Sequence, residues 1–295
     1  MKKFIFFIII FIFFYNISEL TSYSEVIRFA QISDVHFSNL GNSYNSSTFN
    51  NRHVKDTKKL LTLAIQDINN KKNLDFVIFL GDNIDKSNKE DLIGFLNIAN
   101  QLKVPYYLVL GNHDVHKISG ITKTEYMQIV KHYNKSQKKL NSYYSFKIKN
   151  GARAVILDGA MPYMQNSHGK YTLDQLDFLE KFLTKFKKDR FIIFQHFPLI
   201  PPKNNLVSHT LYEPHIYSNL IEKYKNNIVS INSGHYHYED IETDKNGIIH
   251  IVVPGLLQQP HLYQIVEIDY DNILNKKDKT FLNKPKVRIN SIRLE

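Results

Sequence analysis

Residues 108–114, Leu-Val-Leu-Gly-Asn-His-Asp, join an apolar run to three side chains that can bind a metal ion or exchange a proton. Gly111 permits a sharp turn and a close approach of the backbone to a ligand. Asn112 offers a neutral carbonyl oxygen, His113 an imidazole and Asp114 a carboxylate that can orient it. Buried strands of α/β proteins deliver their C-terminal ends to a site in this way. Taken alone, the stretch would also fit an ordinary polar loop.

Four other short apolar runs end in residues of the same kind, which argues against an isolated polar loop. These runs cover residues 29–33, 76–80, 191–195 and 228–233, and each has the composition of a short buried strand. The polar residues that follow them are Asp34, His36, Asp82, His196, His235 and His237. The sequence therefore predicts one site, built from the ends of five strands.

The motifs Asp-x-His, Gly-Asp, Gly-Asn-His-Asp, a single His after a strand and Gly-His-x-His closely resemble those of the calcineurin-like metallophosphoesterases. Their spacing is most similar to that of the bacterial branch that includes class III cyclic-nucleotide phosphodiesterases. The resemblance covers roughly residues 26–260. It implies a four-layer α/β/β/α sandwich, in which two mixed sheets are flanked by helices, and a metal-dependent phosphoester hydrolase, either a phosphodiesterase or a phosphatase.

The resemblance also implies a role for each site residue. Asp82 would bridge two divalent metal ions, whose identity stays open among Mn, Fe, Zn and Co, the borderline metals that mixed His, Asp and Asn ligands suit. Asp34, His36 and His237 would join Asp82 at one ion, and Asn112, His196 and His235 at the other. Two such ions, about 3.5–4 Å apart, activate a bridging hydroxide and clamp the attacking and leaving oxygens. His113 would protonate the leaving group, and Asp114 would hold its tautomer.

The segments between these motifs predict the elements that position them. Apolar residues at helical spacing lie in 60–68 and 92–102, so the first three strands alternate with helices and should form a parallel sheet. A short helix is expected at 124–133, hairpins at 143–157 and 238–253, a helix at 215–224, and late strands at 262–268 and 287–294. Thr172, with Gln175 three residues later, predicts a capping box at the start of a further helix.

The first 24 residues are set apart from the fold. Lys2 and Lys3 precede an apolar run from Phe4 to Tyr15, which fits a signal-peptide core of about 7–15 residues and not the roughly 20 of a membrane span. We expect residues 1–24 to be a signal peptide, or alternatively a short membrane anchor, and residues 25–295 to be one domain. A signal peptide would make the protein an exported one, either periplasmic or secreted. An uncleaved segment would instead anchor the protein to a membrane through its N-terminus.

The composition limits the kinds of chemistry and of binding partner that we expect for this protein. The formal net charge is +10 and there is no cysteine, which excludes disulfides and thiol chemistry. The lysines are dispersed, so we expect a solvated basic surface and no nucleic-acid partner; this surface would help to attract a small anionic phosphoester. Asn83 and Asp85 are expected to hold the loop, and the other histidines to lie outside the metal set. They are His53, His116, His132, His168, His209, His215, His250 and His261.

Two questions stay open. A degenerate member of the same fold, acting only as a binding module, is the alternative function; the loss of a ligand would favour it, and every expected ligand is present. The substrate is also undetermined, because Gln195-His196-Phe197-Pro198 replaces the more usual His-His-Pro-Pro of the bacterial branch. That departure leaves the metal ligands untouched but weakens the cyclic-nucleotide assignment.

Overall fold

The computed structural model describes residues 26–41, 53–149, 151–163, 166–203, 209–270 and 284–294. The expected signal peptide or anchor, residues 1–24, lies outside this part of the chain. Among the described helices, none is long and apolar enough to cross a membrane.

The first sheet has five strands in the order β11-β10-β1-β2-β3. Its parallel part is β1 (Ile27–Ile32), β2 (Phe76–Phe79) and β3 (Tyr106–Leu108), as the alternation of strands and helices predicts. The late strands β10 (Leu262–Asp269) and β11 (Lys286–Arg293) extend it by antiparallel pairing, with β10 against β1. The sheet is therefore mixed.

The second sheet has six strands in the order β4-β5-β6-β7-β9-β8. Its bounds are β4 (Tyr144–Lys147), β5 (Ala152–Ile156), β6 (Arg190–Phe194), β7 (Ile228–Ser233), β8 (Asp240–Thr243) and β9 (Ile249–Val252). The two predicted hairpins, β4–β5 and β8–β9, are its antiparallel edges, and β5, β6, β7 and β9 run parallel.

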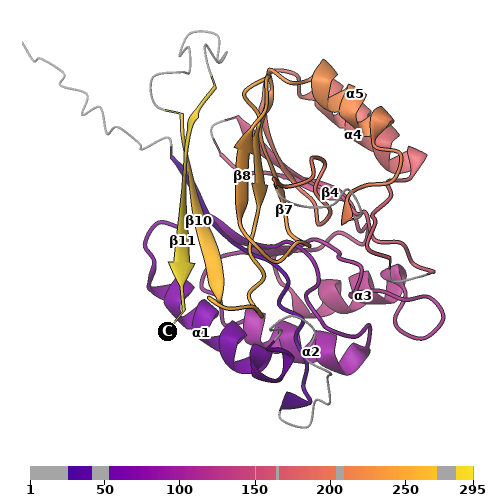
Figure 1. Ribbon diagram of the computed structural model, residues 1–295, viewed down its shortest axis with the longest axis vertical. Coiled ribbons are helices and arrows are strands. Elements are labelled where there is room, and N and C mark those ends of the chain that lie inside the picture. Colours follow the sequence, from indigo (N-terminus) through magenta and orange to yellow (C-terminus); the bar gives the residue numbers. More distant parts are fainter. Residues whose placement is uncertain are drawn as a thin grey trace, which may run out of the picture.

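Helices cover the outer face of each sheet (Figure 1). After a short 3-10 turn at Val54–Asp56, α1 (Thr57–Asn70), α2 (Lys89–Ala99) and α3 (Lys123–Tyr133) pack on the first sheet. The second sheet carries α4 (Leu173–Lys185) and α5 (His215–Lys223). The predicted α/β/β/α order of layers is confirmed.

The apolar strand residues alternate between two cores. Phe76 and Ile78 of β2 face the second sheet, whereas Val77 and Phe79 face the helices. In the core between the sheets, the rings of Phe29 and Phe76 stack with their centroids 4.9 Å apart. Strands buried on both faces in this way read as unbroken apolar runs, which is why periodicity alone could not orient them.

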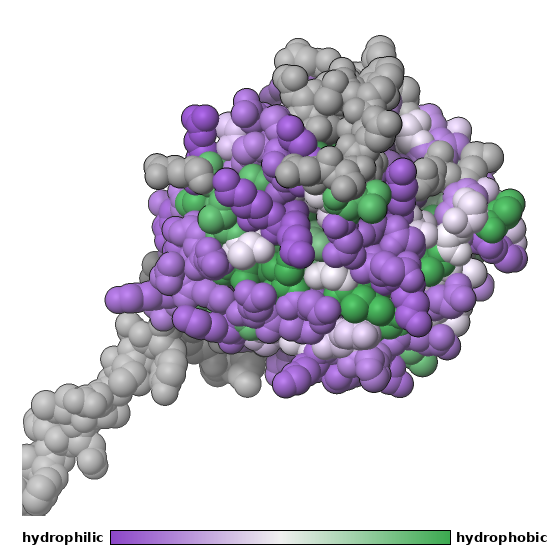
Figure 2. All heavy atoms as spheres, turned by 90° about the horizontal axis from the view of Figure 1, so that it is seen from below, coloured by the Kyte–Doolittle hydropathy of each residue, from purple (hydrophilic) through white to green (hydrophobic). Residues whose placement is uncertain are grey.

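The surface of the molecule, in contrast to these cores, is mainly polar. Seen from below the view of Figure 1, the surface is mainly hydrophilic, and its hydrophobic side chains lie in small separate groups (Figure 2). The described apolar residues of α1 illustrate the reason, because Leu61, Ala64, Ile65 and Ile68 are buried against the sheet.

One helix cap differs from the prediction. The Thr172 side chain accepts a hydrogen bond from the backbone of Gln175, as expected for an N-cap. The Gln175 side chain does not complete a capping box; it bonds with the backbone N–H and C=O of Asp158 at 2.6 and 2.9 Å. Buried Gln175 thus ties α4 to the end of β5, because the backbone groups of Asp158 need partners there. Thr122 and Glu125 do form a capping box, at the start of α3.

Candidate metal centre

All seven predicted metal ligands follow the C-terminal end of a strand, in the two facing sheets. Asp34 and His36 follow β1, Asp82 follows β2, Asn112 follows β3, His196 follows β6, and His235 and His237 follow β7. Asp34, His36, Asp82 and His237 form one group, and Asp82, His196 and His235 form another. Within each group the potential ligand atoms all lie within 4.8 Å of one another. None of the eight other histidines belongs to a metal-competent cluster of the described residues.

Asp82 lies between the two groups. Its Oδ2 atom is 3.4 Å from His36 Nε2 and also 3.4 Å from His196 Nε2. Its Oδ1 atom accepts a hydrogen bond of 2.8 Å from the backbone N–H of His113. The side chain is 2% exposed, so water contributes little to its solvation. A carboxylate equidistant from imidazoles of both groups has the placement that a bridging ligand needs.

Several polar atoms of the centre are buried and, in the described part of the chain, without a hydrogen-bond partner. They are Asn112 Oδ1, together with Asp34 Oδ1 and His36 Nε2, whose contacts with His237 and Asp82 at 3.2 and 3.4 Å lack hydrogen-bond geometry. An unsatisfied buried polar atom is costly, and native proteins rarely leave one without a function. All three belong to predicted ligands, and oxygen and imidazole nitrogen suit a borderline divalent ion. The residues present therefore fit the metals that the motifs predict.

Neighbouring groups orient the imidazoles. His196 Nδ1 lies 2.7 Å from the carbonyl oxygen of Leu80, and His235 Nε2 lies 2.7 Å from that of Ser167. A carbonyl oxygen can only accept, so the hydrogen of each ring resides on the nitrogen named. The opposite nitrogens, His196 Nε2 and His235 Nδ1, lie 3.2 Å apart, and a second proton on His196 resides on Nε2, from where it can be donated to the His235 lone pair. Such contacts set the tautomer and direction of a ligating histidine.

The backbone of the centre is strained. Five predicted ligands have positive φ, with values of 49° at Asp34, 46° at His36, 49° at Asp82, 72° at His235 and 62° at His237. Non-glycine residues seldom adopt this region, and such strain clusters at functional sites. The strain turns these side chains toward one point instead of alternating them along a strand.

Gly111 makes room for the Asp82 carboxylate. A Cβ atom at this position would lie against Asp82 Oδ1 and the Asp82 backbone nitrogen, far inside van der Waals contact. Gly234 has the same relation to the Ser33 hydroxyl, which itself donates to Asp34 Oδ2 at 2.6 Å. The glycines of both motifs are thus required by close approach of one loop to another.

Burial and mutual charge set the protonation states. Burial, assisted by His113, lowers the pKa of His36 to about 4, and burial, assisted by His196, lowers the pKa of His235 to about 3. Burial also opposes the charge of His196, but the Asp82 carboxylate outweighs it and raises the pKa of His196 to about 9. His36 and His235 are consequently neutral at pH 7 and can bind metal, whereas His196 must first lose a proton.

The two carboxylates keep their charge in spite of complete burial. Burial alone would raise the pKa of Asp34, but His237 holds it well below its usual value. Burial acts in the same direction on Asp82, where His196 and then His113 outweigh it and keep the pKa well below the usual value. Two ionised acids among imidazoles form an anionic centre that suits divalent cations.

Asp114 does not have the predicted contact with His113. Its Oδ1 accepts from the backbone N–H groups of Asn83 and Ile84 at 2.8 and 3.1 Å, and its Oδ2 accepts from that of Gly111 at 2.8 Å. The expected orienting role is therefore wrong. The carboxylate points into the protein because the amides of two tight loops need a buried acceptor there.

Asp85, and not Asp114, contacts the ring of His113. The carbonyl oxygen of Asp85 lies 2.8 Å from His113 Nδ1, and its carboxylate Oδ1 lies 3.3 Å from His36 Nδ1. One residue thus contacts both the predicted general acid and a predicted ligand. The prediction that Asp85 only holds its loop was incomplete; the available signal was its place three residues after Asp82 in the same turn. Asn83 does hold the loop, through Asp114 and the Val109 carbonyl.

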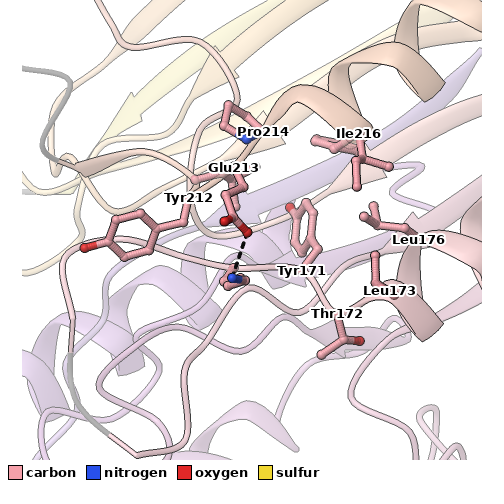
Figure 3. A pocket seen from close by; sticks show the side chains of 11 residues that line it. Tyr171, Thr172, Leu173, Leu176, Tyr212, Glu213, Pro214 and Ile216 are labelled. Atoms are coloured by element: carbon pink, nitrogen blue, oxygen red, sulfur yellow. Dashed lines mark ion pairs between the residues drawn. The ribbon is translucent and has the colours of Figure 1, made fainter.

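A separate pocket of about 310 Å³ lies between the starts of α4 and α5 (Figure 3). Tyr171, Leu176 and Ile216 line it, together with Lys170 and Glu213, whose side chains form an ion pair 2.8 Å long. Tyr212, on the same loop, points away from these apolar side chains. None of the predicted site residues lines this pocket.

Comparison with known proteins agrees with this geometry. The family described as calcineurin-like phosphoesterase matches residues 27–239. A probable glycerophosphodiester phosphodiesterase GpdQ from Arcobacter nitrofigilis is 31% identical over 171 residues, which are 57% of this chain and 56% of that protein. The chain therefore matches little more than half the length of this relative.

Solved structures share the fold. A dimetal phosphatase from Danio rerio has a TM-score of 0.66 at 16% identity, over 91% of this chain and 99% of that one. A phosphatase from Mycoplasma pneumoniae has a TM-score of 0.50 at 14% identity, over 92% of this chain and 94% of that one. At these identities the similarity concerns the fold alone.

Proposed function

The chain belongs to the calcineurin-like phosphoesterase family and is a phosphoester hydrolase, and we propose that it uses two divalent metal ions to hydrolyse small phosphodiesters. The observation that carries the proposal is the sharing of Asp82 between two groups of ligand atoms. Asp34, His36, Asp82 and His237 would hold one ion. Asp82, His196 and His235, with the unpaired oxygen of Asn112, would hold the other. Mn, Fe, Zn and Co all fit this donor set.

The reaction would divide its tasks between the ions and the protein. When bound, two divalent ions acidify a water molecule and neutralise charge on the attacking and leaving oxygens. In this proposal, His113 would donate a proton to the leaving alcohol. The Asp85 carbonyl can only accept, so His113 Nδ1 retains its hydrogen and Nε2 is the nitrogen that exchanges a proton with the substrate.

The preference for diesters rests on the relative from Arcobacter, a probable glycerophosphodiester phosphodiesterase. A binding module without catalysis would need no proton donor beside the ligands, and here His113 packs edge-on against His36 with the ring centroids 4.5 Å apart. The complete ligand set and this donor together support an active hydrolase.

The test is a substrate screen with controlled metal content. Purified protein would be stripped of metal, reconstituted with Mn, Fe, Zn or Co, and assayed against glycerophosphodiesters, cyclic nucleotides, nucleotide sugars and phosphomonoesters. We expect two ions per chain by elemental analysis and the highest kcat/KM with a non-cyclic diester. Higher activity with monoesters would overturn the diester preference, and one ion per chain at full activity would overturn the dinuclear centre.

We also propose that the protein is exported, on the evidence of residues 1–24 alone. Lys2 and Lys3 precede an apolar run of signal-peptide length, and Ser22 and Ser24 fit the small-residue pattern of a cleavage site. Sequencing of the mature N-terminus after expression in a Gram-negative host should place it near Glu25. Recovery of the uncleaved chain from the cytosol would contradict export, and recovery from the membrane would favour the anchor.

A further inference from the structure

Two rim residues lie on the side of the metal centre that does not hold the proton donor. His113 packs against His36, which belongs to the first ligand group. His209 instead lies beside His235, of the second group, with the ring centroids 5.6 Å apart. Tyr236, which stands between two ligands in sequence, is 5.8 Å from His209 by the same measure. His113 thus has its ring contact with a member of the first group, and His209 with a member of the second.

The loops around His209 are fixed by hydrogen bonds. His168 Nδ1 lies 3.2 Å from the carbonyl oxygen of Thr210, and the backbone N–H of Gly169 donates to the same carbonyl at 3.2 Å. The His168 ring also packs on Tyr212, with the centroids 4.3 Å apart. The His235 side chain contacts the carbonyl oxygen of Ser167, which directly precedes His168 in the chain. Hydrogen bonds therefore connect the loop that carries His209 to the ligand His235 through the segment from Ser167 to Gly169.

The exposure of these rings suits contact with a substrate. His209 is exposed and Tyr236 is partly buried, whereas the ligand His237 is buried. A further ring, Tyr238, packs edge-on against Tyr236 at 5.8 Å. Aromatic faces next to a reactive centre bind planar groups by offset or edge contacts at centroid distances of about 4.5–7 Å.

We propose that His209 and Tyr236 form the subsite for the retained ester group of the substrate, and that this group is planar or aromatic. The inference rests on the proposed phosphodiesterase function. In an in-line displacement the leaving oxygen needs the proton and therefore lies toward His113. The second ester group of a diester stays bonded to phosphorus. It points to the side of the line that joins the attacking and the leaving oxygen. The rim beside His235 is the side of the centre without the acid, and its neutral aromatic faces match an aryl or heterocyclic substituent.

The test compares nitrophenyl esters that share one leaving group. Bis(4-nitrophenyl) phosphate retains an aryl group, methyl 4-nitrophenyl phosphate retains a methyl group, and 4-nitrophenyl phosphate retains none. Metal-reconstituted His209→Ala and Tyr236→Leu should each lower the aryl-to-methyl ratio of kcat/KM about tenfold, mainly through KM. Tyr236→Phe, which keeps the ring, should retain the ratio.

His132→Ala is the matched control, since His132 pairs with Tyr133 at 5.0 Å on α3, outside the site. It should leave all three activities unchanged. Equal losses of His209→Ala on all three esters, or no loss on any, would overturn the subsite, and metal content near the wild-type value would exclude an indirect effect through the ligands.

A binding measurement keeps this inference distinct from the proposed function. Calorimetry would compare diphenyl phosphate with dimethyl phosphate on the metal-loaded protein. Tighter binding of the diphenyl ester that disappears in His209→Ala supports the subsite even if no diester is hydrolysed, a result that would refute only the phosphodiesterase function. Equal affinity of the two esters for the wild-type protein would refute the subsite even if diesters are hydrolysed.

Discussion

Replacement of Asp114 by alanine should destabilise the protein itself and not merely the proton transfer. Three backbone N–H groups, those of Asn83, Ile84 and Gly111, donate to the Asp114 carboxylate. Asp114, Asn83 and Ile84 are 0% exposed, so water cannot replace the lost acceptor. Each buried donor without a partner costs about 1–3 kcal/mol, which predicts a loss of roughly 3–9 kcal/mol. The total free energy of unfolding of a domain is only about 5–15 kcal/mol.

The conservative variant should lose less. In Asp114→Asn, the amide oxygen can still accept from Asn83 and Ile84, but the NH2 group faces the Gly111 donor. One unsatisfied contact remains, so we expect a loss of about 1–3 kcal/mol. The fourth donor, Asn83 Nδ2, adds little in either variant because it also bonds with the Val109 carbonyl at 2.9 Å.

The assay is urea unfolding of the metal-free protein, followed by circular dichroism at pH 8. Metal must be absent because bound ions add their own stabilisation. Burial, assisted by the Asp82 charge, raises the pKa of Asp114 to about 7, so at pH 8 the carboxylate is ionised. Asp177→Ala is the control: Asp177 is 58% exposed and its ion pair is with Lys181 on α4, so the change should stay within about 0.5 kcal/mol.

A clear result would refute this reasoning. If the free energy of unfolding of Asp114→Ala is within about 0.5 kcal/mol of the wild-type value, the scatter expected of surface substitutions, the carboxylate does not hold the two loops. If it also loses activity selectively toward esters with poor leaving groups, Asp114 orients His113 after all.

Four further outcomes follow from the centre. Chelation should abolish hydrolysis of a nitrophenyl ester and Mn should restore it, and turnover in protein shown to be free of metal would contradict this. Asp82→Ala should lower the metal content at both positions and Asp34→Ala chiefly at one; two ions per chain in Asp82→Ala, by elemental analysis, would exclude the bridge. His113→Ala should reduce kcat/KM for an alkyl ester by about 10²–10⁴ and far less for a nitrophenyl ester, at unchanged metal content. His196, with a metal-free pKa of about 9, holds a proton at pH 7 that metal must displace, so metal affinity should rise between pH 7 and 9 by up to about tenfold per unit, and calorimetry in different buffers should detect the released proton; a pH-independent affinity would contradict it.

The sequence alone was sufficient to predict the order of the layers and the convergence of the candidate metal ligands. Apolar runs that end in Asp, His or Asn predict parallel strands, and the carboxyl ends of parallel strands meet at one edge of a sheet. Asp34 and His237 are about two hundred positions apart in the chain, yet Asp34 Oδ1 and His237 Nε2 lie 3.2 Å apart in the structure. Residue type and position at a strand end carry that information, because both are local properties of the chain.

Only the tertiary structure decided which neighbours orient the reactive groups. His113 and Asp114 are adjacent in sequence, but they diverge at the turn, and the Asp114 carboxylate is drawn to the amides of a loop thirty residues away. Gln175 left its expected cap for the same reason, since the buried backbone of Asp158 needed its side chain. The contact of His209 with Tyr236 was equally hidden, because it joins two different loops. Such contacts depend on which buried polar groups still need a hydrogen-bond partner once the chain has folded. The linear sequence does not show which groups these are.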